Sequence, residues 1–417
     1  MQAPPLSLYV HLPWCVRKCP YCDFNSYSTD DAPRARYLDA LTQDLRAESR
    51  QAGERELVSV FIGGGTPSLF SPEEIATILR LVERHFRCAP DIEITMEANP
   101  GTVECGDPAG YRAAGVNRLS IGAQSFSEEQ LQTLGRIHSV DDIRRAVDDA
   151  RQAGFDNINL DVMHALPGQT VEAALADLEA AIALGPQHLS WYQLTLEPNT
   201  VFHARPPAGM PDQELAWDIQ QEGQALLAAN GFEQYEVSAY ARDGRRCRHN
   251  LNYWSFGDYL AAGAGAHGKL TTPNSIIRYV KPANPKAYMD DVGSGVLFER
   301  STPRPERPTG AEGEARSAVQ PQRQRAMSER STPDPTVRVL TDSEIVFEYM
   351  LNAVRLADGF DEHEFAARTG LSAGVLAEAA TPARERGLID RNVAGHWSPT
   401  ELGRRFLNDL QAEFLPG

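Results

Sequence analysis

A chain of 417 residues, 42% of them hydrophobic, can bury a large core and is long enough for more than one domain. Its 57 acidic side chains outnumber its 40 basic ones, and the formal charge of −17 disfavours nucleic acid and anionic lipid as partners. No apolar run reaches about 18 residues and the first residues lack the pattern of a secretory signal, so we expect no transmembrane segment and a cytoplasmic location.

From residue 6 to about 240, β-branched and aromatic runs alternate with longer segments of helical period, which predicts repeated β–α units and a parallel sheet. Six such units give either an open doubly wound sheet or most of a barrel. In both folds the chemistry lies at the C-terminal ends of the strands. The predicted strands are Leu6–Leu12, Ser59–Ile62, Ile92–Met96, Arg118–Ile121, Asn157–Val162 and His188–Leu194.

The predicted domain boundaries follow shifts in composition. Residues 1–240 hold the α/β core, and residues 241–300 are an extension, rich in aromatic residues and glycine, that we expect to close one side of the sheet. Residues 301–335 are dominated by Pro, Ser, Thr, Arg, Glu and Gln, which predicts a disordered linker or insertion. The sequence Glu-Arg-Ser-Thr-Pro occurs near each end of this segment, at residues 299–303 and 329–333.

Residues 336–417 are predicted as a separate, small C-terminal domain. Three short helical segments, a β-like turn and a last helical segment follow one another, an order typical of a winged-helix-like fold. Many winged helices bind DNA, but residues 341–417 hold 13 acidic and 7 basic side chains. Pro382 also breaks the third helix, so we do not expect DNA binding.

Three cysteines, Cys15, Cys19 and Cys22, follow directly on the first predicted strand. In a chain without an export signal, metal ligation is favoured over disulfides. Three thiolates are too few for a closed zinc site unless a distant His or Cys completes it, which is the alternative interpretation. A cubane iron–sulfur cluster held by three cysteines instead leaves one iron open, where the amino and carboxylate groups of S-adenosylmethionine (SAM) can bind.

With Gly63-Gly64-Gly65-Thr66-Pro67 after the second strand, the cysteine motif resembles the radical-SAM superfamily. Glycines let backbone groups approach a ligand closely, which suits the methionine amino group of SAM. The resemblance implies a partial (β/α)6 radical-SAM barrel that carries a [4Fe-4S] cluster on the three cysteines.

Further motifs resemble the coproporphyrinogen dehydrogenase (HemN-like) group over residues 6–270, and the tail resembles its C-terminal domain from Thr341. These motifs are Tyr9–Cys15, Glu97–Pro100, Gly122–Phe126, Leu134–Arg136, Leu160–Asp161 and Leu166–Thr170. Within that group, the dehydrogenase has a further cysteine two places after the triplet, where this chain has Phe24. The segment Cys22–Ser26 and the sequence His249-Asn-Leu-Asn-Tyr253-Trp254 instead resemble the HemW branch of heme chaperones. A heme chaperone is therefore the expected function, with the dehydrogenase or another radical-SAM enzyme as the alternative.

The resemblance also implies contacts to SAM. Tyr9, Gly64 and Glu97 match residues that contact the SAM on the cluster. A second group matches a second SAM site in the dehydrogenase. Its members are Gly65, Thr66, Gln124, Arg136 and Asp161 and, more loosely, Tyr21 and Thr195.

The heme site is predicted in the HNxxYW segment. His249 offers an axial ligand, and Tyr253 and Trp254 offer rings for a flat macrocycle. The alternative is that His249 holds a turn while the two rings fill core space, and His267 and Cys247 are rival ligands. The resemblance implies acceptor heme proteins as partners, respiratory enzymes among them, met transiently at the membrane through a partner. The cluster would then regulate heme release.

Overall fold

The computed structural model describes residues 1–416 except residue 30, residues 102–105, residue 243 and residues 295–336. The predicted linker at residues 301–335 and its flanking repeat lie outside the described residues.

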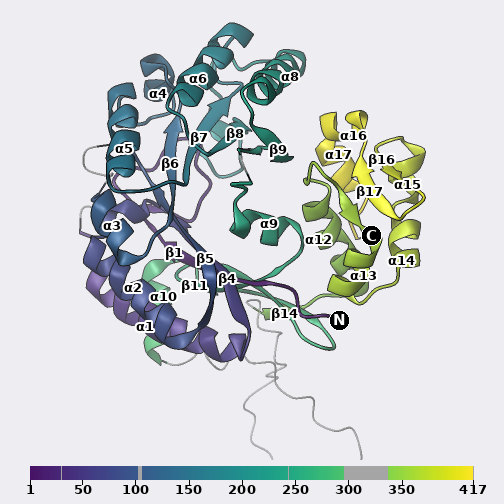
Figure 1. Ribbon diagram of the computed structural model, residues 1–417, viewed down its shortest axis with the longest axis horizontal. Helices are drawn as coiled ribbons and strands as arrows, with labels where there is room; N and C mark the ends of the chain where they lie inside the picture. The colour runs from purple at the N-terminus through teal and green to yellow at the C-terminus, as the bar shows by residue number, and fades with distance from the viewer. Residues whose placement is uncertain (30, 102–105, 243, 295–336, 417) are drawn as a thin grey trace, which may run out of the picture.

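Six parallel strands form the centre of the fold and run in chain order around a curved sheet (Figure 1). Each pairs with the next in parallel register, and the first strand has the predicted bounds. The predicted partial (β/α)6 barrel is therefore confirmed. The strands are β1 (Leu6–Leu12), β4 (Glu56–Gly64), β5 (Arg87–Ala98), β6 (Arg118–Gln124), β7 (Ile158–His164) and β8 (His188–Gln193).

Helices cover the outer face of these strands. α2 illustrates why they form: the Ser71 hydroxyl accepts a hydrogen bond from the Glu74 N–H, and the Glu74 carboxylate accepts one from the Ser71 N–H. Its buried side chains recur at helical spacing and face the sheet. The helices are α1 (Arg34–Ala52), α2 (Pro72–His85), α3 (Pro108–Ala114), α4 (Glu128–Thr133), α5 (Val140–Gln152), α6 (Val171–Ala183), α7 (Val201–Ala204) and α8 (Gln213–Ala229), with a 3₁₀ turn, η1 (Pro67–Leu69).

The segment after the sixth strand extends both edges of the sheet rather than one. β10 (Ala239–Ala241) pairs antiparallel with β8 and with β9 (Glu233–Glu236). At the other edge, β11 (Asp258–Ala262) pairs in parallel with β1. It is followed outward by β12 (His267–Thr271), β13 (Ile276–Val280) and β14 (Val337–Val339). Between the two groups lies α9 (Arg248–Trp254), and α10 (Pro285–Ser294) packs on α1.

A buried ion cluster joins this added sheet to α1. The ammonium group of Lys281, which is 2% exposed, lies 2.7 Å from both the Asp44 and the Glu48 carboxylate. Asp44 also accepts the Tyr288 hydroxyl at 2.8 Å and the Gly263 N–H at 3.0 Å. Every charge in the cluster thus has hydrogen-bonding partners, as burial requires.

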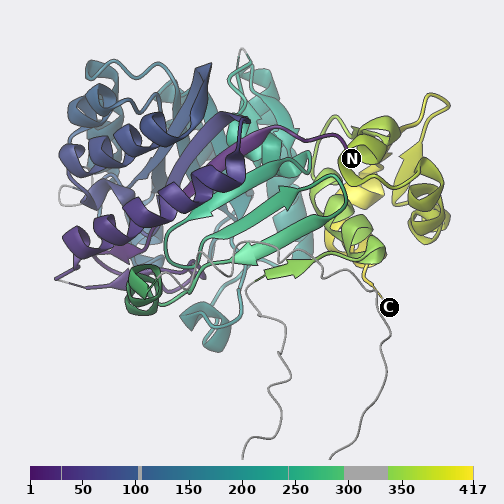
Figure 2. The ribbon, with the colours of Figure 1, turned by 90° about the horizontal axis from the view of Figure 1, so that it is seen from below.

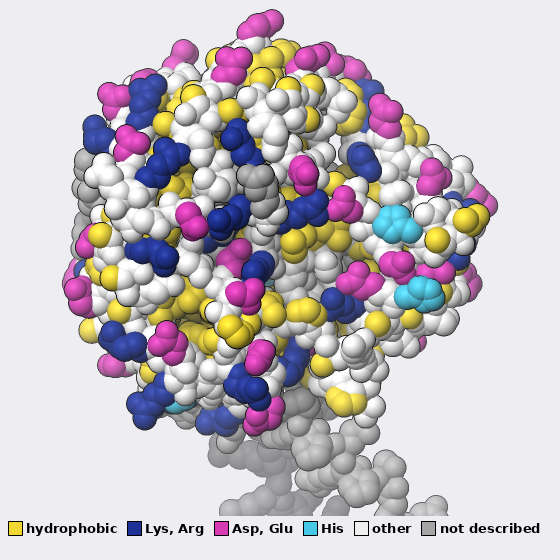
Figure 3. All heavy atoms as spheres, in the orientation of Figure 1, with side chains coloured by type: hydrophobic (Ala, Val, Ile, Leu, Met, Phe, Trp, Pro, Cys, Tyr) yellow, Lys and Arg dark blue, Asp and Glu magenta, His cyan; other side chains and the backbone are white. Residues whose placement is uncertain are grey.

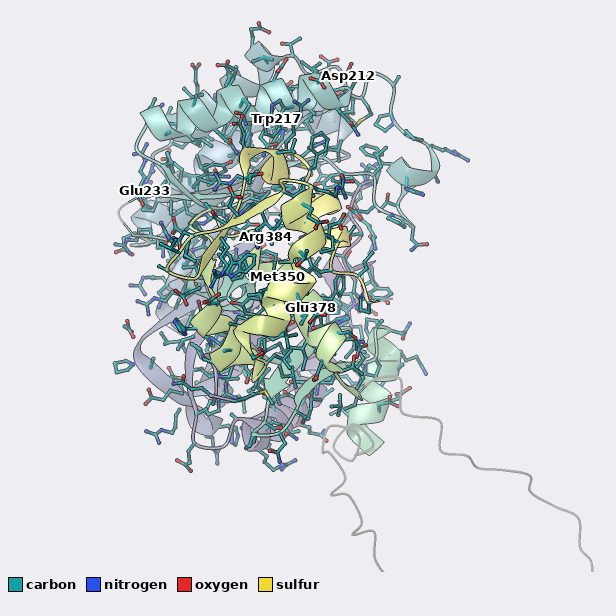
Figure 4. The ribbon with its side chains drawn as sticks, turned by 90° about the vertical axis from the view of Figure 1, so that its right-hand side faces the viewer. Asp212, Trp217, Glu233, Met350, Glu378 and Arg384 are labelled. Atoms are coloured by element: carbon teal, nitrogen blue, oxygen red, sulfur yellow. The ribbon has the colours of Figure 1, made fainter. Side chains whose placement is uncertain are left out.

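The C-terminal domain has its own apolar core and lies beside the barrel, against α8 and α9 (Figures 1 and 4). Met350 and Trp397 are fully buried in this core. The predicted winged-helix-like fold is confirmed, with the third helix ending at Ala379 and a new one starting beside Pro382. Its elements are α12 (Asp342–Ala353), β15 (Phe360–Asp361), α13 (Glu362–Thr369), α14 (Ala373–Ala379), α15 (Thr381–Glu385), β16 (Ile389–Arg391), β17 (His396–Pro399), α16 (Glu401–Arg405) and α17 (Leu407–Ala412).

The N-terminus runs along this domain before it enters the barrel (Figure 2). The Gln2 N–H donates to the carbonyl of Ala367 in α13 at 3.0 Å, so the first residues of the chain are in contact with the C-terminal domain. Basic and acidic side chains are interspersed on the face in Figure 3. Within the described residues, the helices are all too short or too polar to span a membrane.

Candidate functional site

The cysteine motif lies on a loop that is anchored at both ends. Cys15 ends β2 (Trp14–Cys15), which pairs with β3 (Tyr27–Ser28) beyond the loop. The Asn25 amide donates to the carbonyl oxygens of Ala264 and Ala283, at 3.0 and 2.9 Å, and ties the loop to the residues around β12. The loop is therefore positioned by the sheet as well as by hydrogen bonds of its own, such as those that Lys18 donates to the carbonyl oxygens of Phe24 and Ser26.

All three thiols are half-buried, form no disulfide, and line one cavity of about 400 Å³ at the C-terminal ends of the strands. Nearly all of the residues predicted to contact SAM line it as well. They are Tyr21, Gly64, Gly65, Thr66, Glu97, Gln124, Arg136, Asp161 and the loosely matched Thr195. The structure thus brings together side chains from six strand ends.

Arg136 connects the cysteine loop to the wall of this cavity. One terminal nitrogen of its guanidinium group donates to Asn99 Oδ1 at 2.6 Å and to the Gly122 carbonyl at 3.1 Å, while the other lies 3.6 Å from Cys19 Sγ. Asn99 in turn donates to the Thr66 hydroxyl at 3.1 Å. The sequence reasoning assigned no role to Asn99, although it lies in the quoted motif Glu97–Pro100.

Tyr192 is a second lining residue that was missed. Its hydroxyl donates to Gln124 Oε1 at 2.7 Å. The period of two along β8 could have identified it, because Ser190 and Tyr192 share the inward face of this strand.

The glycine turn after β4 has no room for side chains. At Gly64, where φ is +119°, a Cβ atom would lie 2.5 Å from the His11 ring. At Gly65 it would lie 2.5 Å from the Trp14 carbonyl oxygen, one residue before Cys15. The turn therefore packs directly under the cysteine loop.

We expect Gly65→Ala to lower the yield of reconstituted cluster severalfold, because the new methyl group must displace the backbone beside Cys15. The measurement is iron and sulfide per chain after anaerobic reconstitution. Gly374→Ala is the matched control, since its Cβ would make only an ordinary contact at 3.5 Å. Equal cluster content in both variants would contradict the expectation.

Two carboxyl groups, Glu97 and Asp161, face the cavity from β5 and β7. Burial, with a smaller contribution from Asp161, raises the pKa of Glu97 to about 7, although Glu97 accepts the Gly64 N–H at 3.1 Å. Burial also raises the pKa of Asp161, against the hydrogen bonds that it accepts from Asn159 and Ser120. Both are acceptors for ribose hydroxyls or an ammonium group.

The raised pKa of Glu97 predicts a pH-dependent effect of Glu97→Gln on the protein without cofactors. A carboxyl group whose pKa is higher in the folded than in the unfolded state gives stability that is lost as pH rises through the folded value. Relative to the wild type, the variant should therefore gain stability between pH 5 and pH 8, measured by urea unfolding. Exposed Glu222→Gln is the control; a pH-independent difference for Glu97→Gln would refute the expectation.

Tyr9 does not line the cavity but lies one layer below it. Its hydroxyl bonds to His11 Nδ1 at 3.0 Å, and His11 Nε2 bonds to the Asn25 carbonyl at 2.9 Å. Since a carbonyl only accepts, His11 carries its proton on Nε2 and accepts the Tyr9 hydroxyl on Nδ1. Tyr9 thus supports the cysteine loop through His11.

The three residues predicted to bind heme lie away from this cavity, on α9. The His249 ring packs against both Tyr9 and Phe61, with 6.3 and 5.0 Å between ring centroids, and its Nδ1 bonds to the Ser59 hydroxyl at 3.1 Å. Burial lowers the pKa of His249 to about 3.

Tyr253 and Trp254 contact each other, and Trp254 stacks under Arg355 of the C-terminal domain at 4.5 Å. These contacts match the alternative in which the segment is structural. Its role in heme binding stays a prediction.

The two rival ligands differ in access. Cys247 is fully buried, and its thiol lies 3.4 Å from Glu93 Oε1. His267, at the start of β12, is exposed.

This partial barrel, with three thiols and a glycine turn at one cavity, defines a radical-SAM protein. Residues 9–181 match the radical SAM superfamily, and residues 340–406 match the HemN C-terminal domain. The structure is similar to that of coproporphyrinogen III oxidase (HemN) from Escherichia coli. The TM-score is 0.75 at 23% identity, covering 99% of this chain and 90% of that one, which establishes the fold alone.

The sequence relatives are more specific. Heme chaperone HemW of Haemophilus influenzae is 45% identical over 99% of this chain and 98% of its own length. Heme chaperone HemW of Escherichia coli is 44% identical over 100% of this chain and 99% of its own. The chain belongs to the HemW family.

The superfamily implies a [4Fe-4S] cluster and SAM, and the residues fit both. Each of three thiolates on a cubane binds a different iron. Among the described residues, no three His, Cys, Asp or Glu side chains are arranged to hold one metal ion. The glycine turn lines the cavity beside the thiols, where the lack of side chains would let the methionine part of SAM approach the backbone closely.

Proposed function

We propose that this chain binds heme and delivers it to acceptor heme proteins, and that a SAM-ligated [4Fe-4S] cluster regulates the delivery. The observation that carries the proposal is the full-length identity of 44–45% to two heme chaperones, joined to a cavity that gathers all three cysteines. The same proposal places this chain in the cytoplasm. It includes respiratory enzymes among the heme acceptors, which the chain would meet at the membrane.

In this proposal, Cys15, Cys19 and Cys22 would hold the cluster, and the glycine turn, Glu97 and Asp161 would hold SAM. When bound, the cluster can supply the electron that breaks a C–S bond of SAM. Glu97 and Asp161 orient the ribose or the ammonium group, and Arg136 offers a forked donor to a carboxylate. Tyr21, Gly65, Thr66, Gln124 and Thr195 complete the wall.

For the heme ligand, accessibility favours His267 over the other two candidates. Heme must reach the ligating atom from solvent, and Cys247 is fully buried, while a ring nitrogen of His249 is already hydrogen-bonded. His267 lies at the surface, where partial burial of its ring and the nearby Arg278 lower its pKa, so its ring is neutral and can bind iron.

The second candidate function is oxidative decarboxylation of coproporphyrinogen, supported by the HemN-like fold. At the position where the dehydrogenase has a further cysteine, this chain has Phe24, which is 57% exposed at the rim of the cavity. This departure favours the chaperone.

The test is anaerobic reconstitution followed by two assays on one sample: heme binding by absorbance, and coproporphyrinogen conversion with SAM and a reductant. We expect stoichiometric heme uptake without turnover, weakened at least tenfold by His267→Ala and little changed by His249→Ala. If His249→Ala weakens heme binding and His267→Ala does not, the heme ligand is His249 on α9. Conversion of coproporphyrinogen to protoporphyrinogen, with no heme retained, would instead show that the chain acts as the dehydrogenase.

A further inference from the structure

The inside of the barrel below the cofactor cavity is polar where an apolar filling is usual. Asn159, His188, Arg118 and Glu93 are all at least nine-tenths buried there, from four different strands. Buried polar groups are costly unless they are hydrogen-bonded. Their bonds therefore show what holds this region in place.

A continuous chain of hydrogen bonds starts at the carboxylate of Asp161 in the cavity wall. The Asn159 side-chain nitrogen lies 2.8 Å from Asp161 Oδ1, and the Asn159 oxygen lies 2.6 Å from His188 Nδ1. His188 Nε2 lies 2.7 Å from the Tyr235 hydroxyl, which accepts the backbone N–H of Cys247 at 3.2 Å. We call these four side chains, from Asp161 to Tyr235, the relay.

Only one arrangement of protons satisfies the relay. An ionised Asp161 can only accept, so the Asn159 nitrogen faces it and the Asn159 oxygen faces His188. His188 then carries its proton on Nδ1. Burial lowers the pKa of His188 well below its ordinary value, so Nε2 is bare and accepts the Tyr235 hydroxyl. Every donor in the relay thus points toward Asp161.

Ser120 reinforces this orientation. Its hydroxyl donates to the other carboxylate oxygen of Asp161 at 3.2 Å, and it accepts from Asn159 at 2.7 Å. Both carboxylate oxygens are therefore fixed from below, while their remaining lone pairs face the cavity.

The far end of the relay is fixed as well. The Tyr235 carbonyl accepts the Ala357 N–H of the C-terminal domain at 3.0 Å, and Glu236 pairs with Arg355. Cys247 is the residue before α9 and donates the last N–H. Neither end of the relay can move without breaking these bonds.

We propose that His188 and Tyr235 are positioning residues for the cofactor cavity, which hold Asp161 in the orientation that binds SAM. This inference rests on the proposed binding of SAM, and it adds two residues that do not touch the cavity. Loss of the His188 N–H leaves the Asn159 oxygen with only the Ser190 hydroxyl, at 3.1 Å, as a donor. The amide is then held less firmly with its nitrogen toward the carboxylate.

The test compares variants of the full chain with reconstituted cluster. His188→Leu removes both ring nitrogens, while His188→Gln keeps an N–H for Asn159 and a carbonyl for Tyr235. Tyr235→Phe removes one hydroxyl and carries the test if the leucine variant does not fold. Radiolabelled SAM in equilibrium dialysis gives the affinity, and iron content and the thermal midpoint are measured on each sample.

We expect His188→Leu and Tyr235→Phe to weaken SAM binding about tenfold, which is the size of one lost hydrogen bond to a charged group. The SAM affinity of His188→Gln should stay within about twofold of the wild type. In an Asp161→Asn background the same changes should have little further effect, because they act through that carboxylate. Unchanged SAM affinity in Tyr235→Phe would overturn the proposal. So would a tenfold loss of SAM affinity that persists in the Asp161→Asn background. A wild-type protein with full cluster that binds no SAM would instead refute the proposed function.

Discussion

The combined variant Cys15→Ser, Cys19→Ser and Cys22→Ser is expected to fold normally and to bind no iron–sulfur cluster. A serine hydroxyl stays protonated near neutral pH and cannot replace a thiolate ligand. The three side chains are half-exposed on a loop outside the apolar core, so the fold should not depend on them. Iron, acid-labile sulfide and the visible absorbance of the reconstituted protein measure the loss.

Heme transfer by this variant tests the regulatory part of the proposal. We expect heme uptake to persist, while the rate or yield of transfer to an acceptor changes. Cys88→Ser is the control, because Cys88 lies on β5 and does not line the cavity. Transfer that is unchanged in rate and yield would remove the cluster from heme delivery.

Lys281→Met should lower the free energy of unfolding by about 3–5 kcal/mol, since it leaves two buried carboxylates without their cation. Asp44 and Glu48 are 1% and 0% exposed, and burial already raises the pKa of Glu48 even with Lys281 present. Denaturant unfolding at pH 8, where protonation of the stranded carboxyl groups is most costly, measures the effect.

Lys286→Met is the matched control. Its ammonium group pairs with Asp290 at 3.1 Å but is 79% exposed, so the change should be within about 0.5 kcal/mol. Equal stabilities for the two variants would mean that the buried cluster of Lys281 contributes nothing.

The central strands could be predicted because they are short runs of aliphatic, β-branched and aromatic residues, even where, as in β1, Leu and Val alternate with Ser7, Tyr9 and His11. β4 is longer than predicted at both ends. Glu56, Gly63 and Gly64 belong to the strand, although Glu and Gly are residue types with low β propensity. The cavity residues were found because each motif follows a strand, and parallel strands bring such positions to one edge.

What could not be predicted depends on contacts that are distant in sequence. The place of α9 follows from the pairing of β11 with β1, which has no local signature. The prediction of heme binding by the HNxxYW segment therefore rested on its residue types alone. The contact of His249 with Ser59 depends on the fold and has no signal in the sequence. The relay was missed for the same reason, because Asn159, His188 and Tyr235 are on separate elements.

The place of β1 between β4 and β11 also has a consequence for the order in which the chain can fold during synthesis. β1 leaves the ribosome long before β11, yet Leu6 pairs with Asp258 on one side. One edge of β1 therefore stays unpaired until most of the chain has been made, which exposes an aggregation-prone strand edge and slows folding. Cysteines that immediately follow this strand cannot reach their final positions before that, so loading of the cluster should be a late, post-translational event.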